Sequence, residues 1–129
     1  MNLDHNKLVD GFFKELNVEK MLYEAFAERI KSRYPNVSIE VQKSQIKFLG
    51  DKPFCWVWLP IRKGISGRPT KYIIISFALN HRVINPRIVE AANPYPNRWT
   101  HHVIVCKAEE VDAELMEWIE QAYIWKNSN

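Results

Sequence analysis

Two apolar runs constrain the fold of this 129-residue chain more than any other feature. Residues 54–59 and 72–79 are apolar at nearly every position, whereas a strand with one solvated face alternates polar and apolar residues. Uninterrupted apolar runs of this length are typical of central strands that are covered on both faces. Periodicity alone leaves a buried helix open at these positions. We expect two central strands here.

Three further segments have the pattern of half-buried strands. Residues 38–42 and 45–48 alternate polar and apolar side chains, and residues 101–106 are a third short apolar segment. The Pro-rich residues 80–100 are expected to form a connection, with a short helical turn around residues 87–92. About five mostly antiparallel strands are therefore predicted.

Helices are predicted at both ends of the chain. In the first third, apolar residues recur at helical spacing in two segments, with Asp4 as the expected N-cap of the first and Pro35 ending the second. The last segment is amphipathic, and its apolar face consists of Val111, Leu115, Trp118, Ile119 and Ala122. The fold class is α+β in a single domain of residues 1–129: two N-terminal helices, the sheet, and a C-terminal helix packed on it.

Composition limits the class of protein. With 47% hydrophobic and 26% charged residues, the chain is neither collagen-like nor disordered. Cys55 and Cys106 lie in strand-like runs and are expected to be reduced thiols. The N-terminus lacks the pattern of a signal peptide, and no apolar run approaches the roughly 20 residues of a membrane span. We expect a soluble, cytoplasmic protein with no membrane partner.

The net charge of +3 conceals a polarity along the chain. Residues 51–107 carry a net charge of +7, whereas residues 108–129 carry −5. If the two long loops share one end of the sheet, their cations form a basic rim for an anionic ligand or an acidic partner. Solvation of the loops is the simpler explanation of the same charges. The cations are Arg62, Lys63, Arg68 and Lys71 in the first loop and Arg82, Arg87 and Arg98 in the second.

Several chemistries lack the residues that they require. Carboxylates are sparse between residues 37 and 107, and His101 and His102 are adjacent rather than spaced as zinc ligands. The two cysteines lie in apolar strands, where a thiol stays protonated and unreactive. No glycine-rich phosphate loop, nucleophile elbow or dinucleotide-binding pattern is present. We therefore predict no catalytic residue, metal site or cofactor.

The five tryptophans divide between packing and binding. Trp56 and Trp58 share one face of a strand, where they are expected to pack in the core under a helix. Trp99 and Tyr95 lie in a loop beside arginines, where aromatic planes stack on bases or on flat anionic metabolites. Trp99 is therefore the one tryptophan predicted to have a functional role.

The segments 93–103 (Asn-Pro-Tyr-Pro-Asn-Arg-Trp-Thr-His-His-Val) and 111–123 resemble the C-terminal signature of domain of unknown function family 5655, a prokaryotic family. Residues 41–48 and the strand from Phe54 also resemble its pattern, so the resemblance covers residues 20–125 and leaves residues 1–19 as a peripheral helix. The resemblance implies a small α+β fold without established catalytic residues. Asn97 stands where the family usually has Gly, and Asn tolerates the left-handed turn. The motif positions are Lys43, Arg87, Trp99, Thr100, His101 and His102.

The leading hypothesis is a binding or interaction module for an anionic small molecule or an acidic protein partner. A nucleic-acid-associated protein that uses the basic loops is the first alternative. The second is an enzyme with His101 or His102 as general base and Lys43 or Arg87 as an oxyanion donor. The candidate ligand-binding residues are Lys43, Arg87, Tyr95, Arg98, Trp99, Thr100, His101 and His102.

Overall fold

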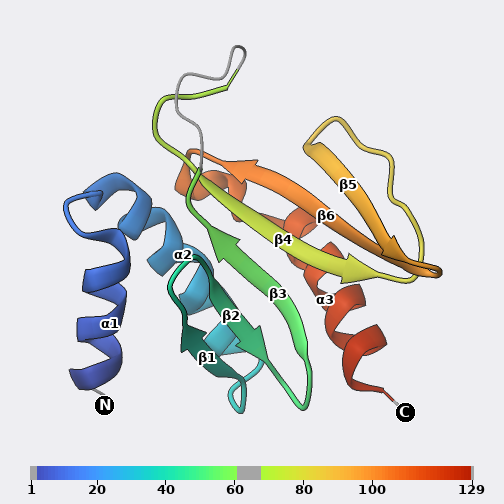
Figure 1. Cartoon of the computed structure of the whole chain (residues 1–129), viewed down its shortest axis with the longest axis horizontal. Helices are drawn as coiled ribbons and strands as arrows, with labels where there is room; N and C mark the ends of the chain where they lie inside the picture. The colour runs from blue at the N-terminus through green and yellow to red at the C-terminus, as the bar shows by residue number, and fades with distance from the viewer. Residues whose placement is uncertain (1–2, 61–67, 129) are drawn as a thin grey trace.

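A computed structural model describes residues 3–60 and 68–128 of the chain. Two helices precede a sheet of six antiparallel strands in the order β1-β2-β3-β4-β6-β5, and a third helix follows it (Figure 1). The α+β class is thus confirmed. The elements are α1 (Leu3–Phe13), α2 (Asn17–Arg33), β1 (Ser38–Val41), β2 (Ile46–Leu49), β3 (Pro53–Trp58), β4 (Ile73–Leu79), β5 (Ile88–Tyr95), β6 (Arg98–Val105), the 3-10 helix η1 (Ala108–Glu110) and α3 (Ala113–Asn127).

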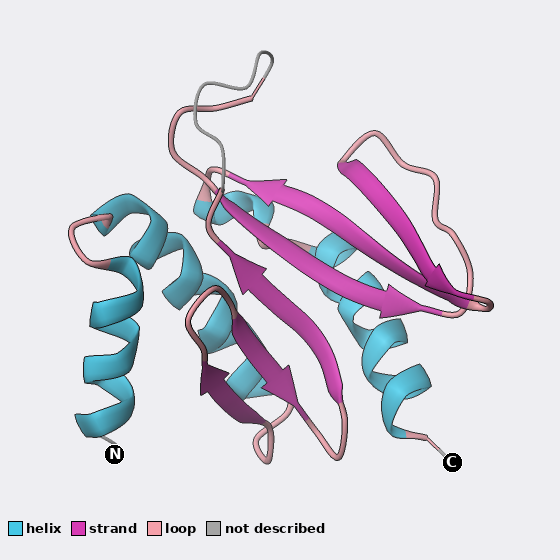
Figure 2. Ribbon diagram, viewed as in Figure 1, coloured by secondary structure: helices cyan, strands magenta, loops and turns pink. Residues whose placement is uncertain are grey.

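The two apolar runs form the centre of the sheet, as predicted. They are β3 and β4, and each pairs with a neighbour on both sides. Helices α2 and α3 lie side by side on one face of the sheet (Figure 2), and α3 contacts both central strands. Side chains from this face and from the two helices form one apolar core, which includes Phe26, Ile30, Phe48, Val57, Ile75, Phe77, Val103, Leu115, Trp118 and Ile119.

The opposite face of the sheet, which we call the open face, differs from the prediction. Within residues 3–60 and 68–128, no helix packs against it (Figures 1 and 2). Trp56 and Trp58 project from this face and are half-buried, so the expectation that they pack under a helix is wrong. Their partners across the strands, Ser76 and Ile74, point the same way. The two central strands are therefore covered by helices on one side only.

The segment predicted as a connection with a helical turn contains a strand. Residues 88–95 form β5, which pairs with β6 at the edge of the sheet. Pro94 and two alanines give this segment a weak strand signal, but an edge strand tolerates proline because one row of its N–H groups needs no partner. Two irregularities in the register accompany the pairing. The β5–β6 turn places Asn97 at a φ of 61°, in the left-handed conformation that the sequence predicted.

The helix ends agree with the sequence in part. Helix α2 ends at Arg33, just before Pro35, and the side chain of Asp112 caps α3 by accepting a hydrogen bond from the Leu115 N–H. Asp4 lies inside the first turn of α1 rather than at its N-cap. None of the helices among the described residues combines the length and apolar character needed to cross a bilayer.

Candidate functional site

A row of polar and aromatic side chains crosses the open face at mid-strand. The strand register aligns one residue of every strand in this row, and side chains at aligned positions share a face. The row is closed at both edges by carboxylates, of which Glu40 forms an ion pair with Lys47 at 3.4 Å. In sheet order the row consists of Glu40, Lys47, Trp56, Ser76, His102 and Glu90.

Ser76 and His102 form a hydrogen-bonded pair at the centre of this row. The Ser76 Oγ and the His102 Nδ1 lie 2.6 Å apart. Ser76 is completely buried, so its hydroxyl is not accessible to a substrate. Burial lowers the pKa of His102, and the charge of Glu90 offsets this in part. This hydrogen bond gives the buried Ser76 hydroxyl and the half-buried His102 ring a partner within the sheet, which polar groups removed from water require. Ser76 is the one polar residue within residues 73–79, which is the signal that could have predicted this contact.

Arg98 occupies the end of the open face nearest the β5–β6 turn. Its guanidinium carbon lies 6.0 Å from the centre of the Trp56 ring and 5.9 Å from the centre of the Tyr95 ring. No carboxylate of the described residues forms an ion pair with it, and its Nε is buried without a hydrogen-bond partner. Arg98 thus joins Tyr95, which the sequence predicted as a site residue, to Trp56, which it did not.

Arg87 has a structural role, because its guanidinium is bonded to three groups of the fold. It donates to Asp112 at 2.8 Å, to Glu114 at 3.1 Å and to the Glu110 carbonyl at 2.7 Å. These contacts attach the start of β5 to the N-terminal end of α3. They also explain part of the charge polarity, because a cation of the basic middle segment pairs with the acidic last helix.

His101 faces the helices and not the open face. It is fully buried, its ring stacks on Phe77 at 4.9 Å, and its Nε2 accepts a hydrogen bond from the Val83 N–H at 2.9 Å. Burial lowers its pKa, so the neutral ring is favoured. His101 therefore holds the segment after β4 against the core.

Trp99 and Thr100 precede His101 in β6 and point in opposite directions. Thr100 lies on the open face, opposite Ala78 of β4. Trp99 lies at the other face, where the guanidinium of Arg82 stacks over its ring at 5.6 Å. The predicted motif of residues 99–102 therefore divides between the two faces of the sheet and does not form one pocket.

Lys43 lies far from the two histidines. It is exposed in the turn between β1 and β2. Strands β2 and β6 are separated by β3 and β4, a distance of roughly 14 Å at the usual strand spacing. The structure therefore does not bring Lys43 within hydrogen-bonding reach of His101 or His102, which an enzyme built on these groups would need.

The cations of the two basic loops do not all lie at one end of the sheet. The second loop runs from the end of β4 to the start of β5 and so returns Arg87 to the end at which β4 begins. Arg68 and Lys71 precede β4, whereas Arg82 follows its last residue and contacts Trp99 at the start of β6. Seven residues of β4 separate them along the strand direction (Figure 1). Arg62 and Lys63 lie outside the described residues. The described cations therefore do not form one rim.

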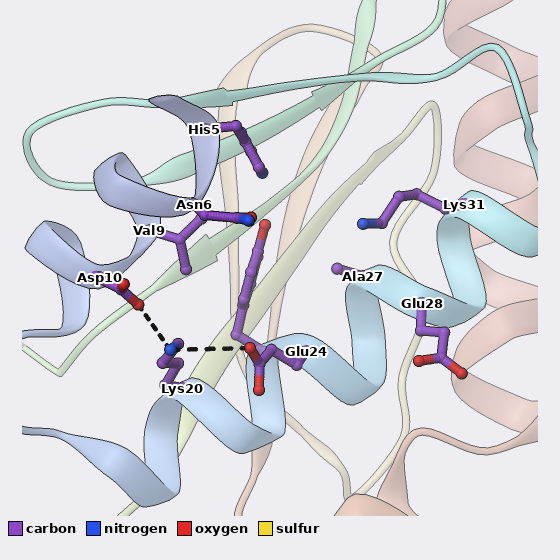
Figure 3. A pocket seen from close by; sticks show the side chains of 10 residues that line it. His5, Asn6, Val9, Asp10, Lys20, Glu24, Ala27, Glu28 and Lys31 are labelled. Atoms are coloured by element: carbon purple, nitrogen blue, oxygen red, sulfur yellow. Dashed lines mark ion pairs between the residues drawn. The ribbon is translucent and has the colours of Figure 1, made fainter. Parts of the chain in front are cut away.

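A pocket of about 530 Å³ lies between α1 and α2. Lys20 lies 2.6 Å from Asp10 and 4.0 Å from Glu24 on one side of it, with Lys31 on the other (Figure 3). Burial raises the pKa of Tyr23, which also lines the pocket and remains a neutral phenol. The lining contains three carboxylates and two lysines, so the pocket has no excess positive charge that would select an anion.

The described residues contain neither a cluster of metal-ligating side chains nor a disulfide. No three His, Cys, Asp or Glu residues of residues 3–60 and 68–128 are grouped as metal ligands. Cys55 and Cys106 are not joined by a disulfide; Cys55 is buried, which raises the pKa of its thiol, and Cys106 is half-buried.

Comparison with known proteins identifies the family but no activity. No curated protein and no solved structure matches the chain. A family model described as "Domain of unknown function (DUF5655)" matches residues 9–125, which span the second half of α1, the whole sheet and nearly all of α3. The chain therefore belongs to the DUF5655 family.

Proposed function

We propose that this domain is a binding module for a small anionic ligand, and that Arg98 on the open face is its anchor. The observation that carries the proposal is the state of the Arg98 side chain. Its guanidinium carbon lies about 6 Å from the centres of both the Trp56 and the Tyr95 ring, its Nε is buried without an acceptor, and it forms no ion pair with the described carboxylates.

An arginine in this state can accept a ligand directly. A guanidinium has five N–H donors in one plane, in a fork that matches a carboxylate or a phosphate group. Stacking on aromatic rings uses the faces of the guanidinium and leaves the donors at its edge available. The two rings therefore orient Arg98 without occupying the groups that would bind an anion.

The contrast with Arg87 supports a ligand role for Arg98. Both arginines come from the basic middle segment, and Arg87 has two carboxylates and a carbonyl as partners. A partly buried charged group without a partner destabilises a fold. The missing counter-ion at Arg98 is what we expect of a residue whose partner is a ligand.

A small ligand fits the open face better than a nucleic-acid strand. Trp56 and Trp58, two residues apart on β3, offer faces on which bases stack. However, the central row ends in Glu40 and Glu90, which repel a phosphate backbone laid across the sheet. Among the described residues, the end of the face around Arg98 is the part that combines aromatic rings with a cation that forms no ion pair. The unpaired thiols Cys55 and Cys106 also fit our proposal of a cytoplasmic location.

A thermal-shift titration at low salt tests the proposal. Inorganic phosphate, acetate, succinate and benzoate are added to the protein and to the variants Arg98→Gln and Arg68→Gln. Arg68 belongs to the other basic loop, at the opposite end of β4, and is the matched control. An anion at 100 times its dissociation constant stabilises the protein by about 2.7 kcal/mol.

We expect at least one anion to raise the melting temperature of the wild type and of Arg68→Gln but not of Arg98→Gln. An equal shift in Arg98→Gln, or no shift with any anion in the wild type, overturns the proposal. Titration with a single-stranded oligonucleotide and an acidic peptide separates the alternatives. If the oligonucleotide binds more tightly than any small anion, and its binding depends steeply on salt, the domain is a nucleic-acid-binding protein and the proposal of a small ligand is wrong.

A further inference from the structure

Three cations from distant parts of the sequence lie toward the end of the sheet where Arg98 lies. Lys52 is in the β2–β3 turn, Arg98 begins β6, and Lys126 is in the last turn of α3. Burial lowers the pKa of Lys126, and the charges of Arg98 and Lys52 lower it further. Lys126 is also 5.4 Å from the centre of the Trp125 ring.

Close packing fixes the backbone of Lys52 beside the last turn of α3, which carries Lys126. The Lys52 N–H donates a 2.7 Å hydrogen bond to the Asn127 Oδ1. A Cβ on Gly50 would come within 2.8 Å of the same oxygen and 3.1 Å of the Tyr123 ring, so a larger residue would have to displace the Asn127 side chain from this contact. The β2–β3 turn is thus attached to the last turn of α3.

The sheet opens at the same place. Pairing between β3 and β4 covers Cys55 to Trp58, whereas pairing between β4 and β6 continues to Leu79 and Trp99. The first residues of β3 therefore separate from the last residues of β4, and the C-terminal half of α3 lies behind the point where they diverge (Figure 1). Lys126 comes from behind the sheet and Arg98 from its open face.

No described acid neutralises this cluster. Within residues 3–60 and 68–128, none of the three cations forms an ion pair. Asp51, the neighbour of Lys52, is exposed and forms none either. Glu120, the acid of α3 nearest to this end that has a partner, bonds to Arg33 and Tyr34. Like charges held together without a counter-ion disfavour the ligand-free protein.

A phosphate group has the charge and shape to fill such a site. Phosphate monoesters carry a charge of about −1.5 to −2 at neutral pH and three strong acceptor oxygens. The fork of Arg98 can take two oxygens, and the ammonium groups of Lys52 and Lys126 act as point charges on the rest. A single carboxylate can neutralise only one of the three cations.

We infer that the ligand of the proposed site is a phosphate monoester, whose phosphate group binds between Arg98, Lys126 and Lys52 and whose organic part lies against Trp56 and Tyr95. This inference rests on the proposed function, since Arg98 is the anchor of both. It adds the two lysines and selects a dianion over a carboxylate.

Isothermal titration at low salt and pH 7.5 tests the inference, with inorganic phosphate, phenyl phosphate, benzoate and acetate as probes. The variants are Lys126→Gln and Lys52→Gln, and Lys7→Gln is the control. Lys7 is an exposed lysine of α1, on the opposite side of the molecule from the C-terminal end of α3 (Figure 1). Phenyl phosphate and benzoate share a ring, so the comparison isolates the phosphate group. A phosphoserine peptide and a nucleoside monophosphate separate the sources of that group.

We expect phenyl phosphate to bind at least about tenfold more tightly than benzoate, the ratio that one additional charge-assisted hydrogen bond supplies. Lys126→Gln should weaken phosphate binding about tenfold on the same reasoning, leave benzoate binding nearly unchanged, and not lower the melting temperature of the ligand-free protein. Lys7→Gln should bind like the wild type.

Two results would overturn the inference while the proposed function stands. One is benzoate binding as tightly as phenyl phosphate, and the other is unchanged phosphate affinity in both Lys126→Gln and Lys52→Gln, in each case with binding still lost in Arg98→Gln. If Arg98→Gln binds phosphate like the wild type, the proposed function fails as well.

Discussion

The attachment of Arg87 to the start of α3 predicts a stability effect that is separate from ligand binding. Arg87→Met keeps the apolar stem of the side chain and removes its three donor contacts. The part-buried hydrogen bond to the Glu110 carbonyl is 2.7 Å long; a hydrogen bond from a charged group contributes about 1.5–3 kcal/mol. The carboxylates of Asp112 and Glu114 are nearly half exposed, at 45% and 47%, so solvent screening limits each pair to less than about 1 kcal/mol.

We therefore expect Arg87→Met to lower the free energy of unfolding by about 2 kcal/mol, mostly through the carbonyl contact. In a domain of this size the melting temperature should fall by roughly 6–8 °C. The assay is urea unfolding monitored by circular dichroism and tryptophan fluorescence, with agreement of the two probes as the check of two-state behaviour. Asp112→Asn is the matched variant, because Asn is as good an N-cap as Asp but lacks the charge.

A double-mutant cycle of these two substitutions isolates the Arg87–Asp112 ion pair. Its coupling energy should be below about 1 kcal/mol and should shrink with added salt. A loss below about 0.5 kcal/mol in Arg87→Met, the range of ordinary surface substitutions, would refute the reasoning. If a well-folded Arg87→Met protein no longer binds anions, Arg87 is a ligand-binding residue, as the sequence predicted.

Two further predictions concern backbone strain and pH. Lys14, which follows the last residue of α1, has a φ of 55°, so Lys14→Gly should raise the free energy of unfolding by up to about 1 kcal/mol. Asn97→Gly, at a φ of 61°, should change this free energy less because Asn tolerates the left-handed conformation. Equal effects of the two substitutions in urea unfolding would contradict the strain argument. Burial holds the pKa of His102 below 6.5 in the folded protein, so the unfolded chain takes up the proton at a higher pH than the folded protein does. The free energy of unfolding should therefore fall as the pH drops from about 6.5 to the pKa of His102 in the folded protein. His102→Gln should be less sensitive over this range, and an unchanged slope would show that His102 does not titrate there.

The central part of the fold could be predicted because its signals are local. The apolar runs of β3 and β4, the helical spacing in α2 and α3, and the turn residue Asn97 each act through their own neighbours in sequence. Strand β5 has no such signal. Its alanines and Pro94 are weak strand formers, and it is a strand because the Tyr95–Arg98 turn returns the chain along β6.

The site was only partly predictable, because strand periodicity groups side chains by face without showing which face a helix covers. The spacing of Trp56 and Trp58 correctly placed both on one face, but the choice of the helix-covered face was wrong. His101 and His102 are adjacent in a strand, so the sequence predicted correctly that they point to opposite faces. Lys126 carries a signal that could have been read, since it is the one basic residue of the acidic segment 108–129.

The position of Trp56 connects the fold to the proposed function. A tryptophan in a central strand would normally pack in the core, yet here the core side of β3 is filled by Cys55 and Val57, and Trp56 is left on the open face. There its ring lies beside the guanidinium of Arg98, which has no counter-ion among the described residues. The side chain of Arg98 thereby covers part of the apolar surface that Trp56 presents on this face. This contact also holds the guanidinium in one orientation, which lowers the entropy that a ligand must overcome on binding. The arginine that lies over the Trp56 ring is thus the same residue that we propose holds an anion.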